Sequence, residues 1–545
     1  MRDFLCALGF MLVISAPVLS SADQFTAGGQ EPALQDSQPA PAPLNTGENL
    51  ALEHEEATRI DAQRQELNRL KQQLGQMQDL LNVLQQPPQE QVHTDTWRTF
   101  HAPTSSGQSI ATPSFAMPID DTFVAEDQME AMIKRVLPGL RRPGFPLRVS
   151  DVAVNTRGAV VIDSTRLDPA AQGLFLPSAI PAEGEPFFGT GWRSTVQGQG
   201  SSVSLSWLAS VGATPLFGAV RLEVSTATVN QFDIFTPQAW LQWDRFTFGI
   251  TDSTFTDTDV VPDTVDINGP NSRAWIRGGQ PQIRYRLVEP FDTKSDPSGA
   301  YVNTSVEMPI SDVYAPAGMG YSSFAATPDI VVAGRYQEGE WAKNPCHGGR
   351  VYDEWWHVQC AGLFRSLGVE RSDDSVRENA FGWGAQLTTR YTIFRDCELT
   401  DYAFASATVG EGIGRYFNDL HLVSAIYDAA YDNVVNDLTP LPVVAWFAAY
   451  QHEWTPHLRS TAVFSQIQLD SRQIPGGTAS LYESGDYISC NVMYHHEPCT
   501  TDKKTGDKIE HNFFAGVEYL YGQKDNLVGG SGDAHRLMFV IAASK

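Results

Sequence analysis

The stretch "QAWLQWDRFTFGIT", Gln238 to Thr251, indicates most directly how this chain folds. Apolar side chains recur at every second position on both sides of Asp244-Arg245, as Ala239, Leu241 and Trp243 before it and Phe246, Phe248 and Ile250 after it. Gln238, Gln242, Thr247 and Thr251 occupy the alternate positions, with Trp240 among them. Because successive side chains of a strand point to opposite faces, the pattern predicts two antiparallel strands joined by a tight turn, with one apolar face.

A second stretch, "PQIRYRLV" at Pro281–Val288, continues the alternation with a different polar face. The two faces of such a strand would carry Ile283, Tyr285 and Leu287 on one side, and Gln282, Arg284 and Arg286 on the other. One face is therefore apolar and the other doubly cationic, in a chain whose formal net charge is −26. An excess of acidic residues argues against nucleic-acid binding, which needs a basic surface.

The same pattern of short alternating segments continues through the last 400 or so residues, where we find no long amphipathic helix pattern. Alternation alone also fits a soluble β-sandwich. Aromatic residues near the predicted turns, such as Trp243, Phe246, Tyr519 and Tyr521, favour the aromatic girdles of an outer-membrane barrel instead. At roughly 25 residues per strand, this length predicts an all-β, transmembrane antiparallel barrel of about 16 strands, a size that leaves an aqueous channel.

The region before the barrel divides into four parts. Residues 1–22 carry Arg2, a short apolar run and small residues before a cleavage site, which is typical of a secretory signal peptide. Residues 23–47 are rich in Ala, Pro, Gln and Ser and predict a flexible tether. A helical segment follows at 48–86, then a linker at 87–145, and the barrel is expected over 146–545.

The helical segment at 48–86 has the heptad spacing of a coiled coil. The apolar positions alternate by three and four residues along one seam, at Ile60, Leu67, Leu70, Leu74, Met77, Leu81 and Leu84. Gln63 interrupts the seam, and Pro87-Pro88 ends it. A single amphipathic helix lying on a globular core is the alternative. So short a coil needs the rest of the chain to oligomerise with it.

Export makes disulfides chemically permissible. Two cysteine pairs lie close in sequence within loop-like stretches, and we predict the bridges Cys346–Cys360 and Cys490–Cys499, with Cys397 free. The histidines near Cys346 and Cys499 could suggest zinc, but no CxxC spacing supports a metal site. We expect no metal and no cofactor.

Several longer blocks resemble the DcaP-like trimeric porins of bacterial outer membranes. The resemblance covers the barrel region in order: "LFLPSAIP" (Leu174–Pro181), "GWRSTVQGQGSSVSLSWLA" (Gly191–Ala209), the long block from Trp243 to Leu287, "GEGIGRYFND" (Gly410–Asp419), "YQHEWTPHLRST" (Tyr450–Thr461) and "GVEYLYGQK" (Gly516–Lys524). The central block with "VPDTVDINGP" is the most specific of these. The resemblance implies a trimer with a periplasmic coiled coil, and a preference for small negatively charged solutes such as aromatic dicarboxylates.

The central block also carries the charges of a predicted pore constriction. Five acids lie in a turn-rich stretch, at Asp252, Asp257, Asp259, Asp263 and Asp266, and four arginines follow, at Arg273, Arg277, Arg284 and Arg286. Arg415 and Arg459 could add to the basic side. If this stretch folds into the channel, acids would face arginines across a narrow waist and favour anions. The alternative is that these charges pair with one another as internal struts.

These observations together predict an outer-membrane porin for passive diffusion of small anionic solutes, and not an enzyme. The expected partners are outer-membrane lipid, two further copies of the chain through barrel and coil, and peptidoglycan as a contact the coil could reach. We find no HExxH or nucleophile-elbow motif. An exported β-sandwich, either carbohydrate-binding or a hydrolase, is the alternative. An active transporter with an N-terminal plug is not expected, because it needs a larger barrel than this chain can form. The N-terminal segment would lie in the periplasm.

Overall fold

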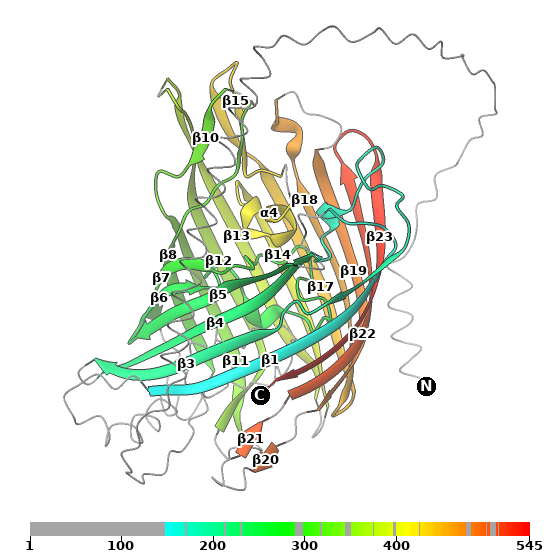
Figure 1. The fold of residues 1–545 in the computed structure, drawn as a ribbon. Helices are drawn as coiled ribbons and strands as arrows, with labels where there is room; N and C mark the ends of the chain where they lie inside the picture. The colour runs from blue at the N-terminus through cyan, green and yellow to red at the C-terminus, as the bar shows by residue number, and fades with distance from the viewer. Residues whose placement is uncertain are drawn as a thin grey trace, which may run out of the picture. The chain divides into compact units, whose positions relative to one another are not determined.

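The computed structural model describes residues 148–544, with gaps at 169–170, 172, 212–213, 229–230, 289–297, 317–318, 344–349, 374, 396–398, 424–425, 476–480, 497–498, 502–507 and 511. Sixteen antiparallel strands in these residues form a closed barrel, seen from the side in Figure 1. The barrel closes where β1 pairs with β23, from Asn155 opposite Ser544 to Asp163 opposite Arg536. The predicted barrel is confirmed, whereas the signal peptide, tether, coiled coil and linker predicted before residue 146 lie outside the described residues.

The barrel strands follow one another around the ring in chain order. They are β1 (Arg148–Asp163), β3 (Ser202–Val211), β4 (Thr214–Thr228), β5 (Gln231–Trp243), β6 (Phe246–Thr251), β7 (Gln280–Val288), β8 (Gly299–Glu307), β11 (Asp329–Lys343), β12 (Arg350–Arg371), β13 (Arg377–Arg395), β14 (Thr400–Glu411), β17 (Pro442–Thr455), β18 (Leu458–Leu469), β19 (Tyr482–His496), β22 (Asn512–Asn526) and β23 (Ser531–Ser544). Short strands add to the barrel sheet or lie outside it: β2 (Arg193–Gln197), β9 (Val313–Tyr314), β10 (Tyr321–Phe324), β15 (Ala429–Asp432), β16 (Asp437–Pro440), β20 (Cys499–Thr501) and β21 (Lys508–Glu510). The described helices are single turns, η2 (Pro177–Ala179), η3 (Thr258–Val260), η4 (Gly414–Tyr416), α4 (Asn418–His421) and η5 (Ser471–Gln473).

The two faces of the strands differ as the sequence predicts. On β7 the side chains of Ile283 and Leu287 are 52% and 48% exposed, while Arg284 between them is 6% exposed. In a closed barrel, an exposed side chain on such an alternating strand faces outward and a buried one faces the lumen. The outer wall is therefore apolar, and the arginines of β7 point inward.

Aromatic side chains gather on the outer face at the end of the barrel where β1 begins and β23 ends. Trp243 and Phe246 flank the turn between β5 and β6, whose register places them directly opposite each other. At the same end of the barrel, Trp454 and Tyr494 lie beside the turn between β17 and β18 and are 49% and 43% exposed. Such a belt is typical of the boundary between lipid and water. Among the described residues, no helix has the length and apolar character needed to cross a membrane.

Three connections at the opposite end of the barrel fold back into the lumen, and we call them the first (residues 174–182), second (252–279) and third (412–428) inner loops. Figure 1 shows α4 of the third inner loop within the ring of strands. Phe255, Tyr416 and Phe417 from two of these loops are fully buried in one apolar cluster with the barrel wall. Phe175 and Val265 belong to a second cluster. Part of the interior is therefore filled by apolar packing, which the alternation of the strands alone does not predict.

Candidate functional site

The second inner loop joins β6 to β7 and crosses the lumen. Its contacts reach strands that are far apart in the ring: Asp257 meets Thr388 of β13, Asp263 meets Arg459 of β18, and Arg277 meets Glu223 of β4. The carbonyl oxygen of Val265 also accepts a hydrogen bond from Arg157 of β1. A connection held at so many points of the wall runs through the interior, which is the condition on which the predicted constriction depends.

Asp257 anchors the first part of this loop. Its Oδ2 lies 3.1 Å from Nε2 of His357 on β12 and also accepts a hydrogen bond from Thr388. Its Oδ1 lies 3.6 Å from Arg335 of β11. Burial by itself would raise the pKa of Asp257, but His357, Arg335 and Thr388 outweigh it and lower the pKa to about 2. The carboxylate is therefore ionised at any physiological pH.

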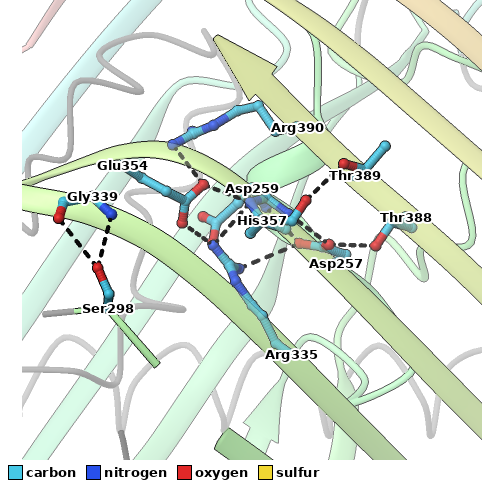
Figure 2. Close-up of polar contacts among 10 residues, drawn as sticks. All are labelled: Asp257, Asp259, Ser298, Arg335, Gly339, Glu354, His357, Thr388, Thr389 and Arg390. Carbon is cyan, nitrogen blue, oxygen red and sulfur yellow. Dashed lines mark hydrogen bonds and ion pairs between the residues drawn. The ribbon is translucent and has the colours of Figure 1, made fainter. Parts of the chain in front are cut away.

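The neighbouring Asp259 belongs to the same network, which Figure 2 shows in close-up. Arg335 pairs with Asp259 and with Glu354, and Arg390 of β13 lies 2.9 Å from Glu354. With all its charges matched at short range, this side of the lumen has little field left to attract a solute. Asp257 and Asp259 thus act as struts, which is the alternative that the sequence left open for these charges.

Asp263 and Asp266 tie the middle of the loop to the opposite wall. Asp263 lies 2.8 Å from Nε of Arg459, whose side chain is 1% exposed. Asp266 donates its backbone N–H to Glu518 of β22 at 2.6 Å and accepts from the Tyr487 hydroxyl at 3.3 Å. Burial raises the pKa of Asp266. These two acids also face the wall.

The basic residues of the predicted site gather on a different side, around β4 and β7. Arg277 and Arg221 share one carboxylate, since Nη2 of each lies within 3.2 Å of Glu223. Arg284 donates to the backbone oxygen of Asp252 at 2.6 Å. The guanidinium of Arg273 stacks over the ring of Trp275, 4.0 Å from its centroid. We call these four arginines, Arg221, Arg273, Arg277 and Arg284, the basic group.

Two acids accompany the basic group, Glu223 and Asp252. Asp252 accepts from the indole N–H of Trp275 at 2.7 Å and from Gln238 at 3.2 Å. Burial lowers the pKa of Arg273 to about 10, so that its guanidinium remains charged at neutral pH. Arg286 is half-buried on β7, two positions beyond Arg284 on the same face.

Arg415 and Arg459 do not join the basic group. Arg415 lies on η4, where Nη2 donates to Gln280 at 2.9 Å and the backbone N–H donates to Asp428 at 2.8 Å. Arg459 is a strut for Asp263. The predicted constriction is therefore divided into anchors on one side and a cluster of arginines on another, instead of acids facing arginines across an open waist.

The total buried charge of the described residues is nearly balanced. Eleven arginines and one lysine stand against thirteen aspartates and glutamates. These buried side chains have no overall excess of positive charge, so a preference for anions would depend on how the charges are distributed. The basic group is where arginines outnumber carboxylates locally.

Sequence reasoning missed several residues of this site, namely Arg221, Glu223, Arg335, Glu354, His357, Asn418 and Asp419. The alternation in "FGAVRLEVS" already places Arg221 and Glu223 opposite the apolar face of that strand. His357 gives no such signal, because its role depends on a residue 100 positions away.

The two predicted disulfides are wrong. Cys360 and Cys490 are free cysteines with exposed side chains. Each lies within a long strand, Cys490 opposite Ala462 and Tyr519, six residues before β19 ends at His496. Six extended residues span about 20 Å, whereas a bridge needs Cα atoms within about 7 Å. Cys346 and Cys397 lie outside the described residues. No three histidine, cysteine or acidic side chains of the described part lie together as a metal site would require.

A closed sixteen-stranded antiparallel barrel with a connection folded into its lumen has the architecture of outer-membrane porins. Among solved structures, the chain is similar to the outer membrane channel DcaP of Acinetobacter baumannii, with 17% identity over 74% of this chain and 98% of that chain and a TM-score of 0.56. It also matches an anion-selective porin from Comamonas acidovorans, with 8% identity, 74% and 100% coverage and a TM-score of 0.39. No protein-family model matches the chain, and no curated protein matches it in sequence. The resemblance to DcaP-like porins is thus confirmed for the fold.

Proposed function

We propose that this chain is a porin of the bacterial outer membrane through which small organic anions diffuse passively. The basic group carries this proposal, because it brings four buried arginines together with fewer carboxylates among the described residues, Glu223 and Asp252 beside the group and Asp266 near Arg273. A low-dielectric wall focuses the field of such a group and raises the local concentration of anions.

The chemistry of the basic group suits carboxylates. A guanidinium binds a carboxylate through two parallel hydrogen bonds and stays charged in a buried site. Trp275 lies beside Arg273 and is only half-buried, so an aromatic ring could stack there while its carboxylates meet the arginines. Aromatic dicarboxylates, which the family resemblance implies, are the solute class we propose.

The other parts of the proposal concern location and assembly. Residues 1–22 would direct export, and the apolar outer wall would face outer-membrane lipid. The heptad seam at 48–86 would hold three copies together in the periplasm, alongside contacts between barrels, and could touch peptidoglycan. We propose no enzymatic activity. An exported β-sandwich has no support, because the sheet closes on itself.

The experiment is a measurement of reversal potential in planar bilayers under a salt gradient, with wild type and the double variant Arg284→Glu, Arg286→Glu. Both side chains lie on the inward face of β7. We expect an anion-selective wild type and a reversed or abolished preference in the variant. An unchanged reversal potential in the variant would refute the proposal.

A further inference from the structure

Two consecutive residues of the third inner loop, Asn418 and Asp419, contact both of the other inner loops. They form the first turn of α4, and their side chains are 4% and 0% exposed. They end the block "GEGIGRYFND", but no charge or spacing in the sequence predicts their contacts, and neither belongs to the basic group.

Asn418 contacts the second inner loop at two positions, one before Arg273 and one at Arg277. Its Nδ2 donates to Oδ1 of Asn268 at 2.8 Å, and its Oδ1 accepts the backbone N–H of Arg277 at 3.0 Å. Backbone bridges from Phe417 to Ala274 and Trp275 lie between these two contacts. The backbone of Arg277 is thus fixed directly by an uncharged side chain.

Asp419 extends the connection to the first inner loop and to the wall. Its Oδ1 accepts the backbone N–H of Ser178 in η2 at 3.0 Å. Its Oδ2 accepts from Nδ2 of Asn271 at 3.2 Å and lies 3.5 Å from the hydroxyl of Tyr482 on β19. The Ser178 hydroxyl also donates to the backbone oxygen of Asp419.

These contacts enclose the stretch that carries Arg273 and Arg277. Asn268 and Asn271 precede Arg273, and the third contact is at Arg277 itself. A buried polar group that loses its hydrogen-bond partner destabilises the fold, so each of these contacts restrains the position of the loop. A shift of about 1 Å in the loop would change the distance between these arginines and those on β4 and β7, and with it the local field.

We propose that Asn418 and Asp419 are positioning residues that hold Arg273 and Arg277 in place and thereby determine the ion selectivity of the channel without contacting the solute. This inference rests on the proposed function. It differs from that function in that the residues concerned contribute no positive charge, and one of them is acidic.

The test compares Asp419→Asn with Asp437→Asn in planar bilayers. Asp437 lies on β16, which like Asp419 lies in the connection between β14 and β17, and its exposed side chain accepts a local hydrogen bond from Thr439. We expect Asp419→Asn to move the reversal potential at least half as far as Arg273→Gln with Arg277→Gln does, and Asp437→Asn to leave it unchanged. Removing an acid by itself should strengthen anion selectivity, so a shift towards zero selectivity distinguishes displacement of the arginines from loss of a charge.

The swapped pair Asn271→Asp with Asp419→Asn restores a donor facing an acceptor and should recover part of the selectivity. If Asp419→Asn does not form a barrel, Asn418→Ala provides the test, since it loses the hydrogen bonds to Asn268 and to the backbone of Arg277 and changes no charge. Selectivity that stays at the wild-type value in a folded Asp419→Asn channel overturns the positioning role. If the arginine variants themselves leave selectivity unchanged, it is the proposed function that fails.

Discussion

Nε2 of His357 lies 3.1 Å from the carboxylate of Asp257, and Nδ1 of the same ring lies 2.5 Å from Glu354. A histidine ring can donate to two carboxylates at once only when both nitrogens carry a proton. His357 has no solvent exposure, so that a charged ring here has no water to solvate it and depends on both acids. The second inner loop is therefore tied to β12 by a buried charged group.

Replacing Asp257 by Asn should release the first part of this loop. Removing one partner from a buried ion-pair network lowers the free energy of unfolding by about 3–5 kcal/mol. We expect a lower unfolding temperature in detergent and noisier single-channel currents. Because the pKa of Asp257 is lowered to about 2 from 3.8, its stabilising contribution is present above about pH 4 and is lost as the pH falls towards 2.

The control for this prediction is Asp373→Asn, which alters an exposed pair with Arg371 at 3.5 Å. Surface pairs contribute about 0–1 kcal/mol, so this variant should match wild type. Equal unfolding temperatures for Asp257→Asn and Asp373→Asn would show that the buried network does not hold the loop.

Replacing Glu223 by Gln should strengthen anion selectivity. Glu223 is the carboxylate that Arg221 and Arg277 share, and Gln keeps its shape while removing the charge. Two guanidiniums then lack their ionic partner, which makes the basic group more positive by one charge. The reversal potential in a salt gradient should move further in the anion direction, and the change should shrink at high ionic strength because salt screens it. A shift towards cations would contradict the assignment of this group.

The barrel itself could be predicted from the sequence because it depends on local pattern. Alternation in "QAWLQWDRFTFGIT" places Leu241 outward and Gln242 inward, and the structure agrees, with the two residues 38% and 6% exposed. The same alternation predicts that the Arg284 side chain points into the lumen, where it is buried. Strand count and closure then follow from length and from the need to satisfy every backbone group in a membrane.

The partners of the loop charges could not be predicted in the same way. Asp263 and Arg459 pair although 196 positions separate their numbers, and nothing local indicates which of several arginines an acid will meet. The prediction that acids face arginines assumed that the second inner loop crosses the lumen as one straight segment. The structure instead turns Asp257, Asp259 and Asp263 to the wall, because a buried carboxylate needs a charged partner and the wall supplies one. The disulfides were mispredicted since closeness in sequence says little about distance when the chain is fully extended.

Replacing Cys490 by Ser should leave stability almost unchanged. The side chain faces outward from β19 and forms no bridge, so its loss removes only a small outward-facing thiol. Loss of a native disulfide would cost about 2–5 kcal/mol. We expect unfolding temperatures of wild type and variant to agree with and without reductant, and a membrane-permeable maleimide to label Cys360 and Cys490. A fall in the unfolding temperature on adding reductant alone would contradict the assignment of free thiols here.

Asp419 should make the stability of the inner loops depend on pH near neutrality. Burial raises the pKa of Asp419 to about 6 from 3.8, and hydrogen bonds from Ser178, Asn271 and Tyr482 oppose this shift only in part. The titratable group that faces it is Tyr482 on β19, while Ser178 of η2 and Asn271 of the second inner loop present only neutral donors. A carboxyl with a raised pKa favours the folded state below its unfolded value and loses that contribution as the pH rises through about 6. The difference amounts to roughly 3 kcal/mol.

The wild-type protein should therefore unfold at a lower temperature at pH 8 than at pH 5, and Asp419→Asn should show a smaller difference, because an amide does not titrate. Tryptophan fluorescence reports the transition, since Trp275 lies beside the backbone bridge to Phe417 in the loop that Asp419 holds. Asp437→Asn is the matched control, as its carboxylate is exposed on β16. If wild type and Asp419→Asn show the same pH dependence, ionisation of this carboxyl does not govern how firmly the inner loops are joined.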